Sequence, residues 1–313
     1  MITAMIVSPD KPITDILAEK AFTFSVELVP PRNGEPVSNL FDKVKLLKEA
    51  GVDFFSITKG AGGSLRGGTT PIAFLIKDKY QLPVIAHFTC METNKQDIEN
   101  SLVDHAYLGI TNVLALRGDP PTGVFSAYEA AANQHQFAHQ LITQIKDLSI
   151  GHYLKRQGFD QENTNYHQGE AHTFCVGAAA YPEPLEISLD QSVDYFVQKV
   201  RQGATYGITQ MTYSPSNYKL FNAKLKEKKA LIPILPGVRI LSSLKQVDFL
   251  QKTFRIEVPK DYVAALENKK AAKDYVKNLV LQFKASGAKG VQFFIMNEAE
   301  ILAEIVAEMK STL

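Results

Sequence analysis

Cysteine, net charge and long apolar runs are all scarce in this chain, and each scarcity excludes a class of protein. Cys90 and Cys175 are its two cysteines, and without a CxxC spacing they argue against a disulfide framework or a zinc site. The formal net charge is +1, so no electrostatic footprint indicates nucleic acid or an anionic membrane as a partner. No run approaches a membrane span and the amino terminus lacks a signal-peptide pattern, so we expect a cytoplasmic protein.

The length and composition are those of an ordinary globular protein with a large core. The chain has 313 residues, of which 45% are hydrophobic and 21% are charged. That length suits either two domains or one large α/β barrel, since such barrels commonly contain about 250 residues.

Short apolar runs rich in β-branched and aromatic residues alternate with segments of helical period. Helical patterns such as 40–51, 95–109 and 189–203 separate these runs, which is typical of a parallel sheet covered by helices. The strand candidates are residues 22–29, 53–58, 83–89, 112–119, 173–181, 206–212, 232–238 and 291–297.

Eight strand–helix units favour a closed (β/α)8 TIM barrel over an open doubly wound sheet. No GxGxxG motif follows the first strand, where an open dinucleotide-binding fold would carry it. We therefore predict a single barrel domain over residues 1–313. Residues 1–20 form an N-terminal extension, 151–171 an inserted polar loop, and 252–288 adds an extra helix before the last strand.

A glutamate stands inside the first apolar run, FTFSVELVPP (22–31). A buried Glu27 has to find a partner, hold its proton or take part in chemistry, whereas a strand with one polar face in solvent would need no such account. Other polar residues also fall at strand ends, where the functional groups of a barrel gather. They are Thr58, His87, Thr89, Arg117, Asp119, Tyr181, Glu183, Gln210 and Asn297.

These residues predict a polar pocket that lacks a metal cluster and a clear nucleophile. Its carboxylates are Glu27 and Asp119, and HFTC (87–90) leaves open the alternative that His87 activates Cys90. The glycine-rich KGAGGSLRGG (59–68) is not a Walker loop. Such a pocket suits a planar organic cofactor or substrate held by amide, hydroxyl and carboxylate groups.

Several of these motifs together resemble the 5,10-methylenetetrahydrofolate reductase family. The resemblance covers about residues 22–300, and ALRGD followed by proline, with AAAYPE and ITQ downstream, is a specific combination. The full set, in chain order, is FSVELVPPRNG, SITKGAGGS, AHFTC, VLALRGDPP, VGAAAYPE, GATYGITQ, ILPGV and FFIMN.

The resemblance implies an oxidoreductase of one-carbon metabolism and methionine biosynthesis. Such enzymes bind FAD and pass a hydride from NADH or NADPH through the flavin to 5,10-methylenetetrahydrofolate, giving 5-methyltetrahydrofolate; the reaction is reversible. It implies that Glu27 is the general acid toward the folate, because an apolar strand end would let it keep a proton near neutral pH. Asp119 would serve both flavin and pterin, and Gln210 and Tyr213 would contact the folate. The residues implied for the flavin are Thr58, His87, Leu116, Arg117, Gly118, Asp119, Phe137, Ala138, Ala180, Tyr181 and Lys199, with a solvated helix lysine as the alternative for Lys199.

The sequence departs from the family pattern mainly on the flavin side. Lys59 stands where a tyrosine is usual, and the loop at 66–70 lacks the usual charged run. Ser192 occupies the position of an acidic residue, with Asp194 close by, and MTYS (211–214) replaces an aromatic-rich segment.

Three other expectations accompany this interpretation. A flavin-independent or modified-pterin one-carbon reductase on the same barrel is one alternative, and a folate- or flavin-binding partner subunit is another. We expect a homo-oligomer, with an accessory electron-transfer subunit as a possible partner. For the 151–171 loop we expect a lid or a subunit contact.

Overall fold

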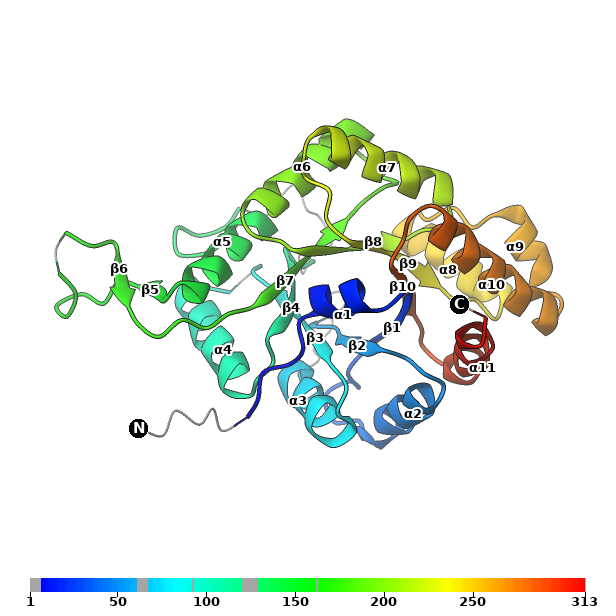
Figure 1. Ribbon diagram of the computed structural model, residues 1–313, viewed down its shortest axis with the longest axis horizontal. Coiled ribbons are helices and arrows are strands. Elements are labelled where there is room, and N and C mark those ends of the chain that lie inside the picture. Colours follow the sequence, from blue (N-terminus) through cyan, green and yellow to red (C-terminus); the bar gives the residue numbers. More distant parts are fainter. Residues whose placement is uncertain (1–6, 61–66, 92, 120–128, 162, 313) are drawn as a thin grey trace.

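The computed structural model describes residues 7–60, 67–91, 93–119, 129–161 and 163–312. Eight parallel strands close into one barrel, which confirms the predicted (β/α)8 architecture (Figure 1). In order around the barrel the strands are β1 (Thr23–Leu28), β2 (Phe54–Ile57), β3 (Val84–Thr89), β4 (Asn112–Leu116), β7 (Cys175–Ala180), β8 (Tyr206–Met211), β9 (Ile234–Arg239) and β10 (Gly290–Phe294).

A helix follows each barrel strand and covers the outside of the sheet. Polar caps fix where several of them begin: Asn94, Ser188 and Asn268 each accept hydrogen bonds from backbone N–H groups of the first turn. These helices are α2 (Ser38–Glu49), α3 (Thr69–Tyr80), α4 (Lys95–Tyr107), α5 (Ala138–Ser149), α6 (Leu189–Arg201), α7 (Pro215–Glu227), α10 (Lys269–Ala285) and α11 (Ala299–Lys310).

Alternation along each strand divides the core into two parts. In β1, Phe24, Val26 and Leu28 face outward and pack in the large core beneath the helices. A smaller core fills the barrel interior and includes Phe54, Leu114, Tyr206 and Leu235. Tyr206 occupies the space that a side chain at Gly177 would need, so this position of β7 has to be glycine.

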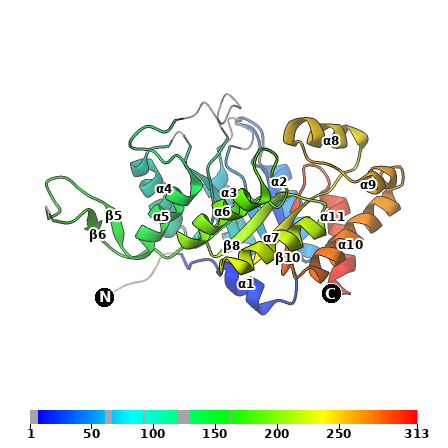
Figure 2. The ribbon, with the colours of Figure 1, turned by 90° about the horizontal axis from the view of Figure 1, so that it is seen from above.

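The N-terminal extension contains α1 (Ile13–Glu19), which closes the amino-terminal end of the barrel. Ile13, Ile16 and Leu17 are buried in the interior core. The Ile13 backbone N–H donates to Asn112 Oδ1 (3.0 Å), which ties α1 to the start of β4. Figure 2 shows α1 at one end of the barrel and α8 at the other. Because α1 blocks the amino-terminal end, the barrel opens at the carboxyl ends of its strands.

Two segments differ from the sequence prediction. Before β10 the chain forms α8 (Leu244–Phe249), a π-helix (Leu250–Phe254) and α9 (Lys260–Ala265) as well as α10, which is more than the single extra helix expected. The predicted loop at 151–171 contains an antiparallel hairpin, β5 (His152–Leu154) and β6 (Tyr166–Gln168). The hairpin projects away from the barrel at the left of Figure 1. Short polar strands of this kind carry too weak a periodic signal to be recognised from sequence.

Truncating Leu17 should destabilise the fold without touching the barrel mouth. Its side chain is 1% exposed, and removing buried methyl groups costs about 2–5 kcal/mol when the site cannot collapse. We expect Leu17→Ala to lower the free energy of unfolding by that amount in urea titrations followed by circular dichroism. Glu19→Gln, on the exposed side of the same helix, is the control and should change it by less than about 0.5 kcal/mol. Equal effects of the two variants would show that α1 does not plug the barrel.

Candidate active site

Inward-facing side chains at the carboxyl ends of the strands form a polar mouth above the apolar interior. Ser25 and Ser56 sit one inward position below this level and are joined through Gln292. Ser25 Oγ donates to Gln292 Oε1 (2.5 Å), and Gln292 Nε2 donates to Ser56 Oγ (2.8 Å). This buried network separates the apolar core from Glu27, the next inward residue of β1.

The carboxyl group of Glu27 faces His87 across the mouth. Glu27 Oε2 lies 3.6 Å from His87 Nε2, and the two side chains are 18% and 6% exposed. Burial raises the pKa of Glu27 to about 8, although the charge of Arg239 partly opposes the shift. Burial lowers the pKa of His87 to about 3. Near neutral pH both groups are therefore uncharged, and Glu27 is the one that carries a transferable proton.

Two buried polar atoms at this level, one of them in the pair itself, lack a hydrogen-bond partner in the described part of the chain. They are Thr58 Oγ1, just after β2, and His87 Nε2. Unpaired polar atoms at a barrel mouth indicate a ligand that supplies the missing partners. Gly118 adds space at the end of β4, because a side chain there would press on Met91 and Thr89 and its φ of +94° suits glycine. A planar polar ring such as a flavin fits these features.

The side chains predicted to hold the rest of the flavin gather along β4, α5, β7 and α6. The Arg117 guanidinium lies 5.5 Å from the ring centroid of Phe137, which immediately precedes α5. Lys199 Nζ donates to the Ala179 carbonyl (2.8 Å) and lies 5.6 Å from the centre of the Tyr181 ring. Lys199 is partly buried, and burial lowers its pKa to about 8.

The remaining flavin-side predictions fall around this cluster. Ala138 begins α5 and is buried, Ala180 ends β7 and is buried, and Leu116 packs at the top of the interior core. Asp119 is exposed. The pKa of Tyr181 is raised first by burial of its own ring and second by the negative charge of Asp119. The structure thus brings Asp119 to the Tyr181 side of the mouth. Residues 120–126 and the glycine-rich residues 61–66 lie outside the described residues.

On the folate side the two predicted residues differ in placement. Gln210 is partly buried late in β8, and its Oε1 accepts the backbone N–H of Met211 (2.9 Å). Tyr213 is 6% exposed, packs against Tyr262 and donates its hydroxyl to the Arg239 carbonyl (2.9 Å). The structure therefore does not bring the Tyr213 ring to the mouth as a stacking surface; instead it supports the end of β9.

Three departures from the family pattern have a structural explanation. Lys59 turns outward, with Nζ 4.5 Å from the centre of the Phe88 ring, and burial lowers its pKa. Ser192 donates to the Tyr181 carbonyl (2.6 Å) and so holds the end of β7. Asp194 forms an ion pair with Lys228 on the surface and does not substitute for an acidic residue at position 192.

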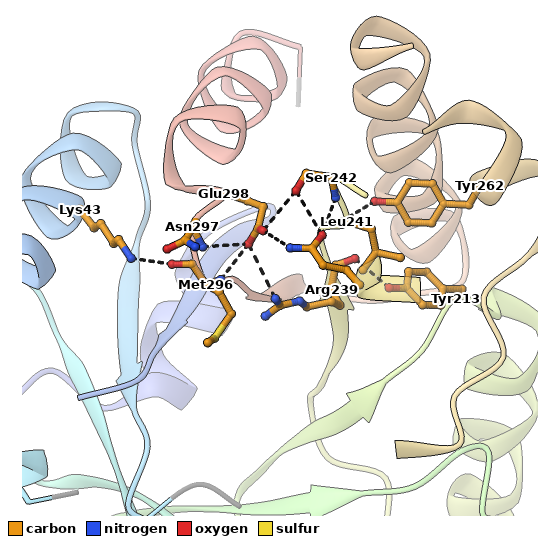
Figure 3. Close-up of polar contacts among 10 residues, drawn as sticks. Lys43, Tyr213, Arg239, Leu241, Ser242, Tyr262, Met296, Asn297 and Glu298 are labelled. Atoms are coloured by element: carbon orange, nitrogen blue, oxygen red, sulfur yellow. Dashed lines mark hydrogen bonds and ion pairs between the residues drawn. The ribbon is translucent and has the colours of Figure 1, made fainter. Parts of the chain in front are cut away.

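Sequence reasoning missed Arg239 and Glu298, which form the other side of the mouth (Figure 3). Arg239 ends β9, and its Nη2 lies 3.8 Å from Glu298 Oε2. Glu298 is 3% exposed and accepts the backbone N–H groups of Met296 (2.8 Å) and Asn297 (3.1 Å). The strand run ILPGV was ended one residue before Arg239, so extending the strand-end criterion by one position would have included it.

A hollow of about 280 Å³ adjoins the mouth between the ends of β1 and β10, lined by Leu28, Pro30, Lys43 and Met296 among others. A larger one of about 440 Å³ lies between α4 and the β5–β6 hairpin, away from the strand ends. Only the first is close enough to extend the mouth.

The fold and the mouth define a (β/α)8 barrel protein with a protonated carboxylic acid at the strand ends. The sequence profile of the methylenetetrahydrofolate reductase family matches residues 12–310, and the chain belongs to that family. This confirms the resemblance found in the motifs.

Individual relatives agree with that membership. A rice (Oryza sativa subsp. japonica) protein named "Probable methylenetetrahydrofolate reductase (NADH)" is 30% identical over 295 residues, covering 91% of this chain and 48% of that protein. The 5,10-methylenetetrahydrofolate reductase of Escherichia coli K12 is 24% identical over 287 residues, covering 88% of this chain and 87% of that one. The chain spans about half the length of the fission yeast and rice relatives it matches.

The fold also matches a solved structure. That structure is of an uncharacterised Clostridium thermocellum protein described as binding two copies of 5-methyl-5,6,7,8-tetrahydrofolic acid. The TM-score is 0.58 and the identity 16%, with 96% of this chain and 99% of the other covered. At this identity the match shows the barrel fold.

Among the helices of the described residues, none combines the length and the apolar character of a membrane span.

The raised pKa of Glu27 should appear as a pH dependence of stability. Between the ordinary pKa of 4.5 and about 8, the folded protein keeps a proton that the unfolded chain has lost, so stability falls as pH rises through that interval. The unfolding free energy of Glu27→Gln minus that of the wild type should rise by on the order of 3–4 kcal/mol between pH 5 and 8, measured by urea unfolding. For Glu186→Gln, at an exposed position, the same difference should not change with pH. A flat difference for Glu27→Gln would contradict the burial argument.

Proposed function

We propose that this chain reduces 5,10-methylenetetrahydrofolate to 5-methyltetrahydrofolate with a hydride from NADH or NADPH. The observation that carries the proposal is the buried carboxyl group of Glu27, 3.6 Å from His87 at the barrel mouth of a member of this family, where burial raises its pKa to about 8. Opening the methylene bridge requires a proton on the folate nitrogen that leaves the bridging carbon, which is N10 because the product keeps the carbon on N5, and Glu27 is a buried group able to give that proton near neutral pH. His87 is neutral with a pKa of about 3 and so cannot be that acid.

Glu27 and Gln210 act toward the folate, and Asp119 bears on the pterin from the end of β4. A polar site that leaves buried hydrogen-bonding groups unpaired without its ligand discriminates strongly in favour of a matching ring. Thr58 Oγ1 and His87 Nε2 are such groups, and we assign them to the cofactor ring.

FAD is the cofactor that these surroundings fit. Bound there, it would accept a hydride from the nicotinamide and return it to the folate carbon. This chain would hold it through Thr58 and His87 at the mouth, the glycine space at Gly118, and the Arg117, Tyr181 and Lys199 side chains. The rice relative's name includes NADH, which makes NADH the first donor to test.

An anaerobic visible spectrum of the purified protein tests the cofactor and the substrate together. Oxidised flavin absorbs near ~450 nm, and adding 5-methyltetrahydrofolate should bleach that band if the enzyme runs the reaction in reverse. A band that persists would contradict a folate substrate. Absence of a band, with folate turnover by nicotinamide alone, would instead establish the flavin-independent alternative.

Glu27→Gln separates the two halves of the reaction. The variant lacks the transferable proton but keeps nearly the same shape, so folate reduction should fall by roughly 10²–10⁴-fold. Oxidation of NADH with an artificial electron acceptor should continue at close to the wild-type rate, because it needs no proton from Glu27. Rapid-mixing kinetics of the two half-reactions measure both, with Glu186→Gln as the matched control. An equal loss in both halves would assign Glu27 to cofactor binding.

A further inference from the structure

We propose that Arg239 is a positioning residue for the acid step: held at the mouth by Glu298, it stabilises the carboxylate that forms on Glu27 when the proton leaves. This inference rests on the proposed function. In the step, the O–H bond of Glu27 breaks, an N–H bond forms on the substrate nitrogen, and the electron pair of the broken bond stays on the Glu27 oxygen. The site must then hold a negative charge that burial disfavours.

The strand register places the two side chains at one level of the barrel. Glu27 is paired with Phe294, and Phe294 is paired with Arg239, so one strand separates them. Residues in register on parallel strands point to the same side, here into the mouth. Neighbouring strands lie about 4.8 Å apart, which puts the two Cα atoms roughly 10 Å apart. Together the two long side chains can span that distance.

Arg239 keeps most of its donor capacity in this arrangement. A guanidinium has five N–H donors, and within the described residues its charged contact is Glu298, at 3.8 Å. That distance is longer than a hydrogen bond. No ion pair within 4 Å joins Arg239 to Glu27 in the same part of the chain, which agrees with a protonated resting acid.

Glu298 is fixed by other groups and does not depend on Arg239. Besides the two backbone N–H groups, its carboxylate accepts from Gln246 Nε2 (2.5 Å). Burial would raise the pKa of Glu298, but these hydrogen bonds and the charge of Arg239 together bring it below its ordinary value. Glu298 is thus a fixed anion beside the guanidinium, and Figure 3 shows the contacts that hold it. The main chain of Arg239 is held in turn by the Tyr213 hydroxyl.

The groups that bear on Glu27 come from several elements. His87 on β3 is uncharged, Arg239 on β9 is a cation, and Glu298 after β10 offsets part of that cation. On the far side, Asp119 follows β4 and bears on Tyr181. Arg239 is therefore the group that favours the ionised form of Glu27, and the charge of Glu298 weakens that effect. Removing Arg239 and removing the charge of Glu298 should shift the pKa of Glu27 in opposite directions.

The test is the pH profile of folate reduction in the holoenzyme, with NADH oxidation as the second readout. Arg239→Leu removes the cation, so the basic limb should move upward by about one pH unit and the plateau rate should fall by roughly 10–100-fold. Glu298→Gln keeps a side-chain oxygen facing the guanidinium but removes the moderating negative charge, so the limb should move downward. Arg239→Lys should retain most of the wild-type position and rate. Arg255→Leu, at an exposed ion pair, should match the wild type throughout.

A substrate-free measurement separates this inference from the proposed function. The pH-dependent difference in unfolding free energy between Glu27 and Glu27→Gln proteins should extend to higher pH in an Arg239→Leu background and to lower pH in a Glu298→Gln background. If these intervals and the kinetic limb stay where they are in the wild type, Arg239 does not act on Glu27 and the inference is wrong. If the intervals move as expected but the wild type does not turn over folate, the proposed function fails while the coupling stands.

Discussion

Closure of the parallel sheet is the constraint on which the rest of this structure depends. A closed barrel covered by helices buries both faces of every strand, so an inward polar group needs a partner or a place at an open end. Here α1 seals the amino-terminal end with Ile13, Ile16 and Leu17, and the Ser25–Gln292–Ser56 network satisfies the next polar level. Glu27 then stands at the first level that can meet a ligand.

The same constraint sets the chemistry of the mouth. Removing the carboxyl of Glu27 from water makes its ionised form costly, so it holds its proton to about pH 8, and the same burial keeps His87 neutral. An acid that holds its proton well also gives it up reluctantly. A nearby cation resolves this conflict, and Arg239 lies at the right level, aimed by a carboxylate that is itself fully hydrogen-bonded. Proton retention and proton release therefore depend on different elements of the barrel.

Much of the fold was predictable because strand and helix periods are local properties. The eight strand runs were recognised to within a few residues, and Glu27 was singled out because a carboxylate in an apolar strand is costly. Arg239 lies one residue beyond the predicted strand run, and its pairing with Glu298 depends on which strands become neighbours and at what register. Tyr213 was expected to stack on a ligand, but its hydroxyl finds the Arg239 carbonyl and its ring finds Tyr262, contacts that no sequence window contains. The α1 plug was likewise expected only as an extension.

The central claim is that Glu27 carries a proton at neutral pH, and difference infrared spectroscopy tests it most directly. The carbonyl stretch of a protonated carboxylic acid is distinct from the bands of a carboxylate, and subtracting the Glu27→Gln spectrum assigns it. The account predicts a protonated Glu27 band at pH 7 that disappears with a midpoint near pH 8. A Glu27 already ionised at pH 6 would contradict it, because the acid could then neither hold nor deliver the proton.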